Sequence, residues 1–483
     1  MWKWQNIRKN DDGMVLVFFG MCLAVIVGMA ALTFDLGRLA ATQTDLQGYA
    51  DSVALAAAGE LDGGTTAIAR AQSAAENMID DTQTFADGSQ TLGSAADFTL
   101  RFLTGLPADD TASVDAFVTT DSTEASLVEV TVTTRTVFLP FARSMAALLG
   151  TAGPNEDVDA VAIAGFTSWA CDVTPLMFCV PDGYNADDNV GDTILLRSGG
   201  QGTAWGPGDF GFLDPSKVAV DPNGPCGGLT GVNLDACLIA AAGNITQCFE
   251  QQGVDTEPGQ KVGIENAIFN TRFDMYTGIM NSKRNNPSYA PGPHVTKGII
   301  PNGGGNCVGT NGIASPDSVP FPWDDCFDTG NCPKGGGRIG NGQWPLGRAN
   351  YITTNFDGTD PDPTLPTRYQ LYLEELADAA GGDILTGRSE TGRPRCSNAP
   401  TINDPERRVF IAAAINCVEN PINGAAVNVP VQEFVKIFLL RPVGNSTTSP
   451  PVFDLWVEVV GSAGGAGSSV DGAVFHDVVT LYR

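Results

Sequence analysis

The first strong pattern along the chain is an apolar run, Met14–Phe34, whose 21 residues include no charged side chain. As a helix with a rise of ~1.5 Å per residue it would extend about 31 Å, which matches the hydrocarbon core of a bilayer. Lys3, Arg8 and Lys9 precede it, and positive charge ahead of a first apolar segment favours a cytoplasmic N-terminus. The pattern predicts a cytoplasmic tail at residues 1–13, a membrane anchor at 14–34 and an exported remainder.

A cleavable signal peptide is the alternative interpretation of this run. Such a peptide has an apolar region of ~7–15 residues that ends in a small-residue cleavage site. The run here is longer and passes directly into a helical pattern, which favours an uncleaved anchor. Within it, Gly20, Ala24 and Gly28 recur on one helical face. Small residues at this spacing let membrane helices approach closely, so they indicate either helix packing, including self-association, or only the usual composition of such helices.

The helical pattern continues beyond the apolar run. One apolar stripe has spacings of 7, 4, 3 and 4 and consists of Leu39, Leu46, Ala50, Val53 and Ala57. After Gly63-Gly64, a second short helix is expected with Ile68, Ala71, Ala75 and Ile79 on related positions. We expect the stripe to pack on its own domain in preference to forming a coiled coil.

Alternating and continuous apolar segments divide the exported part. Strands are predicted at 98–103, 126–138 and 158–166, with a short helix at 139–149, which together make an α+β unit over residues 35–168. In residues 169–483, helices are expected at Leu234–Gln251 and Arg368–Ala380. Between them, Asn285–Pro366 is dominated by Gly, Pro, Asn and Asp. Four apolar runs after Arg408 read as strands, several of them buried on both faces.

The cysteines separate these two regions. One, Cys22, lies in the apolar run, and ten lie beyond residue 170: Cys171, Cys179, Cys226, Cys237, Cys248, Cys307, Cys326, Cys332, Cys396 and Cys417. An even number confined to the exported part predicts five disulfides whose pairing the spacing leaves open. Zinc is the competing interpretation, but the chain has no Cys-x-x-Cys pair and no His at ligand spacing.

Charge and histidine content exclude several classes of function. The chain has 27 Lys and Arg against 55 Asp and Glu, a formal net charge of −28. A surface this acidic repels nucleic acid, so we expect no nucleic-acid partner. The two histidines, His294 and His476, give little basis for catalysis or metal binding through imidazole.

Candidate chemistry is limited to acidic turns. Two loops carry three aspartates each: Asp187, Asp188 and Asp192, and Asp357, Asp360 and Asp362. Oxygen-rich loops can hold calcium, but neither fits the EF-hand pattern, and solvated turns are the better interpretation. The glycine-rich segments 302–306 and 334–338 lack the context of a phosphate loop. We therefore expect no cofactor and no enzyme activity. A hydrolase with a carboxylate pair hidden among the 55 acidic residues stays open as the alternative.

The segment Asp11–Leu61 combines an Ala-rich helix, Tyr49–Ala58, with Gly13, Asp35, Gly37, Arg38, Leu46, Gln47 and Asp51. In these features it resembles the N-terminus of TadE/TadG-like Flp pilus-assembly proteins. It implies a single-pass protein of a bacterial inner membrane, with its bulk in the periplasm and with other Tad/Flp pilus proteins as partners. It implies a non-enzymatic role as a scaffold or a minor pilus-associated protein.

Two departures refine this resemblance. Processed pseudopilins of the group carry Glu five residues after a Gly, whereas Phe18 stands at that distance from Gly13, which favours a TadG-like over a TadE-like protein. Many TadG-like proteins also carry a metal site beginning Asp-x-Ser-x-Ser; the nearest segment here, Asp87–Thr91, ends in Thr and follows no apolar strand. The expected fold is α+β: one transmembrane helix, a juxtamembrane α+β unit, and a loop-rich, disulfide-stapled mixed α/β periplasmic domain.

Overall fold

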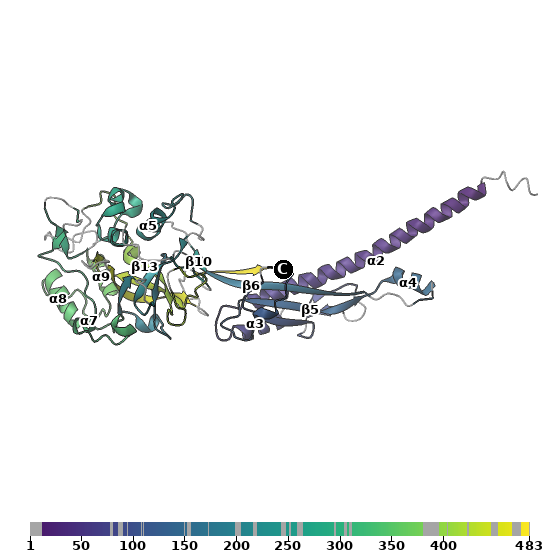
Figure 1. Cartoon of the computed structure of the whole chain (residues 1–483), viewed down its shortest axis with the longest axis horizontal. Coiled ribbons are helices and arrows are strands. Elements are labelled where there is room, and N and C mark those ends of the chain that lie inside the picture. The colour runs from purple at the N-terminus through teal and green to yellow at the C-terminus, as the bar shows by residue number, and fades with distance from the viewer. Residues whose placement is uncertain are drawn as a thin grey trace, which may run out of the picture. The chain divides into compact units, whose positions relative to one another are not determined.

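The chain divides into two compact units, residues 1–167 with 478–483 and residues 168–477 (Figure 1). The computed structural model describes residues 12–77, 81–85, 90–93, 95–107, 109, 111–148, 150–151, 156–171, 173–198, 204–215, 220–242, 248–250, 253–257, 264–293, 296–303, 307–308, 312–379, 396–402, 404–422, 425–445, 453–465 and 475–482. The assignment of the parts to cytoplasm, membrane and periplasm stays a prediction.

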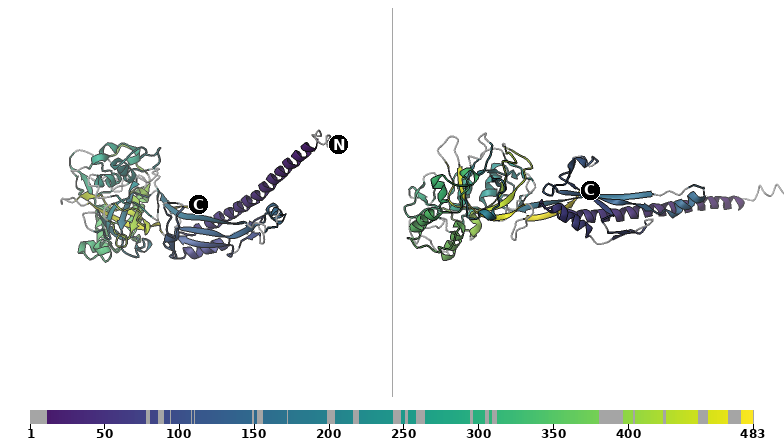
Figure 2. Two further views of the ribbon diagram at one scale, coloured as in Figure 1. Left: turned by 45° about the vertical axis from the view of Figure 1, so that its right-hand side comes forward. Right: turned by 90° about the horizontal axis from the view of Figure 1, so that it is seen from below.

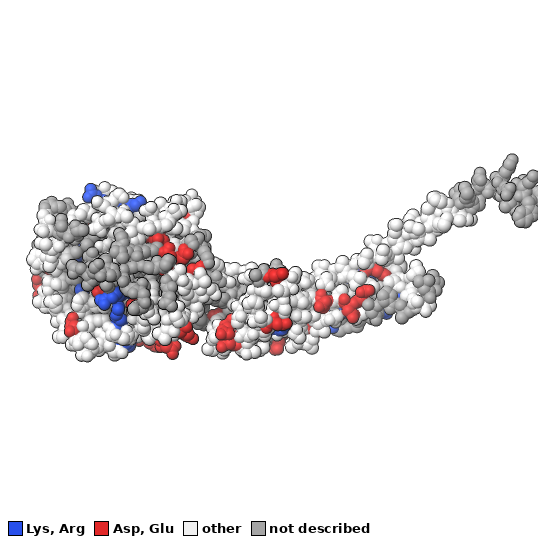
Figure 3. Space-filling model, in the orientation of Figure 1, with Lys and Arg blue, Asp and Glu red and all other residues white. Residues whose placement is uncertain are grey.

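Helix α2, Asp12–Ala58, runs for 47 residues and joins the apolar run to the first unit (Figure 1). In the part of the chain that the structure describes, it is the one helix long and apolar enough to cross a membrane. None of the described side chains in its apolar half is buried, and the visible face of this half is uncharged in Figure 3. Its other half is buried at Leu46, Ala50, Val53 and Ala57, which confirms that the stripe packs on its own domain.

The first unit packs α2 and a second helix on one face of an antiparallel sheet. Alternate residues of the central strand, Val128, Val130 and Val132, are buried against α2. The predicted strands and helices here are confirmed, within a few residues at their ends, except that Ile79 of the second short helix lies outside the described residues. The elements are α3 Ala67–Glu76, β3 Phe98–Leu103, β4 Val118–Thr119, β5 Leu127–Val137, α4 Pro140–Leu148 and β6 Glu156–Cys171, with a small hairpin of β1 Asp81–Thr82 and β2 Thr91–Leu92.

Two details of this unit differ from the alternating pattern. Glu129 is buried, although it lies between Val128 and Val130 on the opposite face of the strand, and its carboxylate pairs with Arg101 at 2.5 Å on the adjacent strand. The last strand, β17 (Phe475–Leu481), pairs with β6, so residues 478–483 belong to the first unit. The expected second domain, 169–483, was wrong at this end because a period-two pattern carries no information on a distant partner.

The second unit is built on a sheet that closes on itself. Its order is β14-β13-β7-β9-β8-β16, and β16 pairs again with β14, while the short β15 extends the edge. The pairs β13–β7 and β8–β9 are parallel and the other pairs are antiparallel. The strands are β7 Leu176–Cys179, β8 Thr193–Ser198, β9 Asp209–Phe212, β13 Val409–Ile415, β14 Glu433–Leu439, β15 Gly444–Asn445 and β16 Phe453–Gly465.

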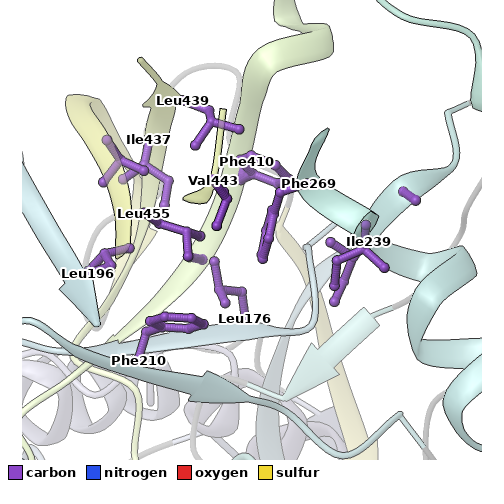
Figure 4. Close-up of a cluster of buried hydrophobic side chains, with 14 of the residues drawn as sticks. Leu176, Leu196, Phe210, Ile239, Phe269, Phe410, Ile437, Leu439, Val443 and Leu455 are labelled. Carbon is purple, nitrogen blue, oxygen red and sulfur yellow. The ribbon is translucent and has the colours of Figure 1, made fainter. Parts of the chain in front are cut away.

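Alternate side chains from all six strands of this ring meet in one cluster, which Figure 4 shows in part, for example Phe210, Phe410 and Leu455. The helices α5 (Val232–Ala240) and α6 (Glu265–Asn270) add Ile239 and Phe269 to it. The intervening strand residues pack outward against two further clusters, so the prediction of strands buried on both faces is confirmed. A small barrel filled by side chains in this way has no lumen and only short edges.

Helices and turns surround this barrel. The predicted helix at Arg368–Ala380 is confirmed as α9, Arg368–Ala379. The predicted helix Leu234–Gln251 was too long: α5 ends at Ala240, and Cys248–Glu250 forms strand β10, which pairs antiparallel with 169–171. The remaining elements of this unit are α7 Asp325–Thr329, α8 Pro345–Asn355, β11 Ile299–Pro301, β12 Gly312–Ala314, and the 3₁₀ turns η2 Asp187–Asn189, η4 Thr271–Phe273, η5 Gly278–Lys283, η6 Pro287–Tyr289, η7 Gly335–Gly337 and η8 Pro405–Arg408. The 3₁₀ turn η1, Asp115–Phe117, belongs to the first unit.

Five disulfides join the ten cysteines of the second unit: Cys171–Cys248, Cys179–Cys417, Cys226–Cys237, Cys307–Cys396 and Cys326–Cys332. Cys22 is the free cysteine, within α2. Paired sulfurs cannot serve as thiolate ligands, so the zinc interpretation is excluded for these ten. Cys326–Cys332 and Cys307–Cys396 bridge the Gly- and Pro-rich region, as staples were expected to do.

Candidate functional site

The first charged residue after the apolar run, Asp35, connects α2 to α4. Its side chain is buried, and its Oδ2 accepts the backbone N–H of Ala142 at 2.7 Å, while Oδ1 accepts that of Phe141 at 3.4 Å. These N–H groups belong to the first turn of α4, where no intrahelical acceptor exists. A carboxylate there also meets the positive end of the helix dipole. Asp35 therefore fixes the start of α4 against the point where the apolar run ends.

Arg38 lies one turn further along α2, among aromatic rings. Its guanidinium carbon is 4.7 Å from the ring centroid of Phe85 and 5.8 Å from those of Phe34 and Phe138. Phe34 also contacts Phe141 of α4 edge-on, with 5.5 Å between ring centroids. Cations over aromatic faces are held by the ring quadrupole. The Asp-x-Gly-Arg segment is thus the joint between α2, α4 and the loop that carries Phe85.

Two glutamines on α2 bind the sheet. Gln43 Nε2 donates to the carbonyl of Asp159 at 2.8 Å, and Gln47 Nε2 donates to that of Val161 at 3.1 Å, both on β6. Gln47 also donates to Asp51 Oδ1 at 2.8 Å, which orients its amide. The next carbonyl with the same direction, that of Ile163, accepts the N–H of Tyr482 after β17. The glutamines therefore donate hydrogen bonds to the β6 carbonyls that the chain end at β17 does not bind.

The small residues of α2 that the sequence singled out show no comparable contact. A Cβ added to Gly20, Gly28 or Gly37 would meet no atom within 4 Å, and Ala24 is exposed. Gly13 belongs to α2, but its surroundings lie outside the described side chains. The structure thus brings Asp35, Arg38, Leu46, Gln47 and Asp51 to the contact between α2 and its unit, and leaves the small residues on the surface of the helix.

Basic side chains occupy the two acidic loops that were considered for calcium. Lys334 Nζ is 2.6 Å from Asp192 Oδ2, and Asp187 accepts the N–H of Ser462 at 2.9 Å. In the other loop, Arg348 binds both oxygens of Asp360 at 2.8 and 2.9 Å. Among the described residues, no group of three or more His, Cys, Asp or Glu suits a metal ion.

The other candidates from the sequence lie elsewhere. Of the segment Asp87–Thr91, residues 87–89 lie outside the described residues, and His294 does too. The second histidine, His476, lies in β17.

A buried ion cluster in the second unit had no signal in the sequence. Arg368, Asp324 and Glu458 have fully buried side chains, with Arg368 2.5 Å from Asp324 and 3.0 Å from Glu458. Their large sequence separations leave no recognisable spacing.

Each carboxylate of this cluster is saturated with donors. Asp324 accepts from the backbone of Asn341 and Gly342 at 2.8 Å and from Thr193 at 3.0 and 3.1 Å. Glu458 accepts the N–H groups of Arg368 and Tyr369 at 2.9 and 2.8 Å, at the start of α9. These hydrogen bonds hold α9 and residues 324–342 against the barrel. Because the oxygens of both carboxylates already accept hydrogen bonds within the protein, neither is placed to bind a substrate.

A comparison with family models bears on the N-terminal segment alone. Residues 13–60 match the model described as "Putative Flp pilus-assembly TadE/G-like". Neither the search of curated proteins nor that of solved structures gave a match. The matched residues are those of α2 and its joint with the first unit, and the match confirms the resemblance seen in the sequence: residues 13–60 of this chain are similar to TadE/G-like proteins of Flp pilus assembly.

Proposed function

We propose that this chain is a non-enzymatic, membrane-anchored component of a Tad/Flp (type IVb) pilus assembly apparatus, acting as a periplasmic scaffold or a minor pilus-associated protein. The TadE/G-like match over residues 13–60 carries the proposal. The anchor lies in the bacterial inner membrane with the N-terminus in the cytoplasm, an orientation supported by Lys3, Arg8 and Lys9 ahead of the apolar run. Five disulfides in the second unit suit an oxidising compartment such as the periplasm.

The continuity of α2 supports a scaffolding role. The helix passes from its apolar half into the core of the first unit without a break. Asp35 and the two glutamines, Gln43 and Gln47, then fix it to α4 and β6. An anchor joined rigidly to its folded unit holds that unit at a set distance from the membrane. A tethered enzyme needs no such joint, because a flexible linker would serve it equally well.

The state of four acidic residues in the second unit also supports a non-enzymatic role. The buried carboxylates of Asp324 and Glu458 are enclosed by donors, and Asp192 and Asp360 are paired with Lys334 and Arg348. A glycosidase of the paired-carboxylate type needs one protonated and one ionised carboxyl that both face a substrate cleft. None of these four acids has that arrangement.

A deletion strain of the native host tests the proposal. We expect the clean deletion to lose most surface pili, counted by electron microscopy, and the wild-type gene to restore them. A variant in which residues 14–34 are replaced by an unrelated membrane helix of equal length keeps the body and tests the anchor. Wild-type pilus number in the deletion strain would contradict the role in pilus assembly.

A further inference from the structure

The surface around α4 combines exposed apolar side chains with an unusual charge pattern. Phe138 lies two residues before the first residue of the helix, and Phe141 and Met145 lie four residues apart on one face of it. Their exposed fractions are 37%, 45% and 56%, whereas Leu139 and Ala146 face the unit and are buried. Such a helix has one apolar face toward its own domain and a second toward the surroundings.

The placement of α4 indicates what covers the second face. Asp35, which binds the first turn of α4, is the first charged residue after Met14–Phe34. Figures 1 and 2 place α4 at the end of the first unit from which the apolar half of α2 projects. If that half spans a bilayer, α4 starts at the depth where α2 leaves the hydrocarbon. The exposed Phe34 of α2 contacts Phe141 and so continues the apolar surface of α4.

The charges of the surrounding segment fit a lipid surface. About one residue in nine of this chain is acidic, yet residues 130–155 contain no Asp or Glu. Of the two arginines in this segment, Arg135 pairs with Asp97 of the same unit, and Arg143 lies on α4. Arg143 lies 4.8 Å from the ring centroid of Phe138, and Arg38 is close to the same ring. Phenylalanine and methionine that enter a membrane interface beside arginines at headgroup level are typical of interfacial amphipathic helices.

We propose that α4 is an interfacial helix whose exposed face, Phe138, Phe141 and Met145, inserts into the headgroup–acyl boundary of the membrane that α2 spans. The helix would then fix the tilt and depth of the first unit, because α2 and α4 form two contacts with one surface. The proposal rests on the membrane anchoring by α2 and is independent of the role in pilus assembly.

Depth-dependent quenching in liposomes tests this directly. The full chain, with Cys22→Ala, carries Met145→Cys labelled with an environment-sensitive fluorophore and is reconstituted into phosphatidylcholine–phosphatidylglycerol vesicles containing nitroxide lipids. We expect blue-shifted emission and loss of most of it to quenching. Gln72→Cys, an exposed site on α3 of the same unit, is the matched control and should remain unquenched. A second sample labelled at the native Cys22 reports whether α2 is inserted.

The possible outcomes test the interfacial helix and the membrane anchor separately. Quenching at Cys22 and at position 145 supports the proposal. Quenching at Cys22 alone overturns it and leaves the anchor intact, whether the probe at 145 is in water or is shielded by a second copy of the chain. Absence of quenching at both sites overturns the interfacial helix and the membrane anchor together. The role in pilus assembly is decided by pilus counts, not by this experiment.

Discussion

Asp35 caps α4 from a different helix, and this explains an aspartate at the end of a membrane-length segment. A charge next to the hydrocarbon is unfavourable unless its oxygens are bonded. Here both oxygens accept N–H groups of Phe141 and Ala142. The sequence marked Asp35 through its family motif, but the partner, more than 100 residues away, could not be derived from any local spacing.

Asp35→Ala should therefore destabilise α4 by about 1 kcal/mol, the usual contribution of an N-cap side chain to helix stability. Hydrogen exchange in residues 140–148 of the reconstituted protein is expected to become faster, whereas Asp35→Asn, which keeps an acceptor, should change it less. Asp45→Ala, on the same helix, is the control. Equal exchange of α4 in wild type and Asp35→Ala would contradict the capping role.

Buried glutamates make the second unit sensitive to pH. Burial raises the pKa of Glu375 to about 7, although a hydrogen bond from Tyr351 at 2.6 Å opposes the shift. Burial likewise raises the pKa of Glu433 to about 7. The ordinary value is 4.5, so the folded state binds more protons than the unfolded chain between these limits. Stability contributed by these groups is complete below about pH 4.5 and is lost as the pH rises through 7.

We expect the free energy of unfolding of the second unit to fall between about pH 5 and about pH 8, by up to roughly 3 kcal/mol per group. Glu375→Gln should remove part of this decrease in unfolding free energy, and adding Glu433→Gln should remove a further part. Buried Glu458, whose pKa burial also raises, keeps the remainder. Chemical denaturation at each pH, followed by tryptophan fluorescence, measures the free energy of unfolding, since Trp205, Trp344 and Trp456 lie in this unit. The exposed Glu419→Gln is the control. A decrease that is unchanged in the double variant would refute the assignment.

At the scale of elements, the backbone carbonyls along one edge of β6 accept hydrogen bonds from two different parts of the chain. The glutamines of α2 bond the carbonyls of Asp159 and Val161, and the chain end at β17 bonds that of Ile163. Sequence patterns predicted α2, β5 and β6 well because each has a clear period. They missed α8, Pro345–Asn355, because Pro345 and Gly347 resemble loop residues although Pro is well tolerated at the first helical position.

Replacing both glutamines with alanine, Gln43→Ala with Gln47→Ala, should leave two β6 carbonyls without their donors. Each lost bond costs about 1 kcal/mol, so amides of β6 and of α2 beyond residue 40 should exchange faster. Gln72→Ala removes a glutamine from the surface of α3 and should have no effect. Unchanged exchange in β6 after the double substitution would show that the edge does not depend on α2.

At the scale of the whole molecule, the two units are stabilised by different means. The first unit packs α2 and α3 on a sheet, and the ten paired cysteines all belong to the second unit. Composition predicted the disulfides and where they lie. It could not predict the closed barrel, because the pairs β7–β13 and β8–β16 join strands from opposite ends of the second unit's sequence. It could not predict the cluster around Arg368 either, because Asp324 and Glu458 lie 44 and 90 positions from Arg368. The motif residues of the candidate site were found, but not their partners.

The disulfide that closes the longest loop should matter most for the second unit. Cys179–Cys417 spans 238 residues and Cys326–Cys332 spans 6. Cys179→Ala with Cys417→Ala should cost roughly 2–5 kcal/mol of unfolding free energy. The pair Cys326→Ala and Cys332→Ala is the matched comparison and should cost less. A larger loss from the short loop would contradict this ranking.

Co-purification from mildly solubilised membranes tests the central claim most directly, that α2 anchors this chain within a Tad/Flp pilus apparatus. Tagged full-length protein should recover other Tad/Flp machinery proteins in the membrane fraction. The variant with residues 14–34 replaced by an unrelated membrane helix controls for contacts that the body makes alone. Recovery of the chain as a soluble species lacking its first ~35 residues, the length of a tail plus one membrane span, or in membranes without any pilus protein, would contradict the account.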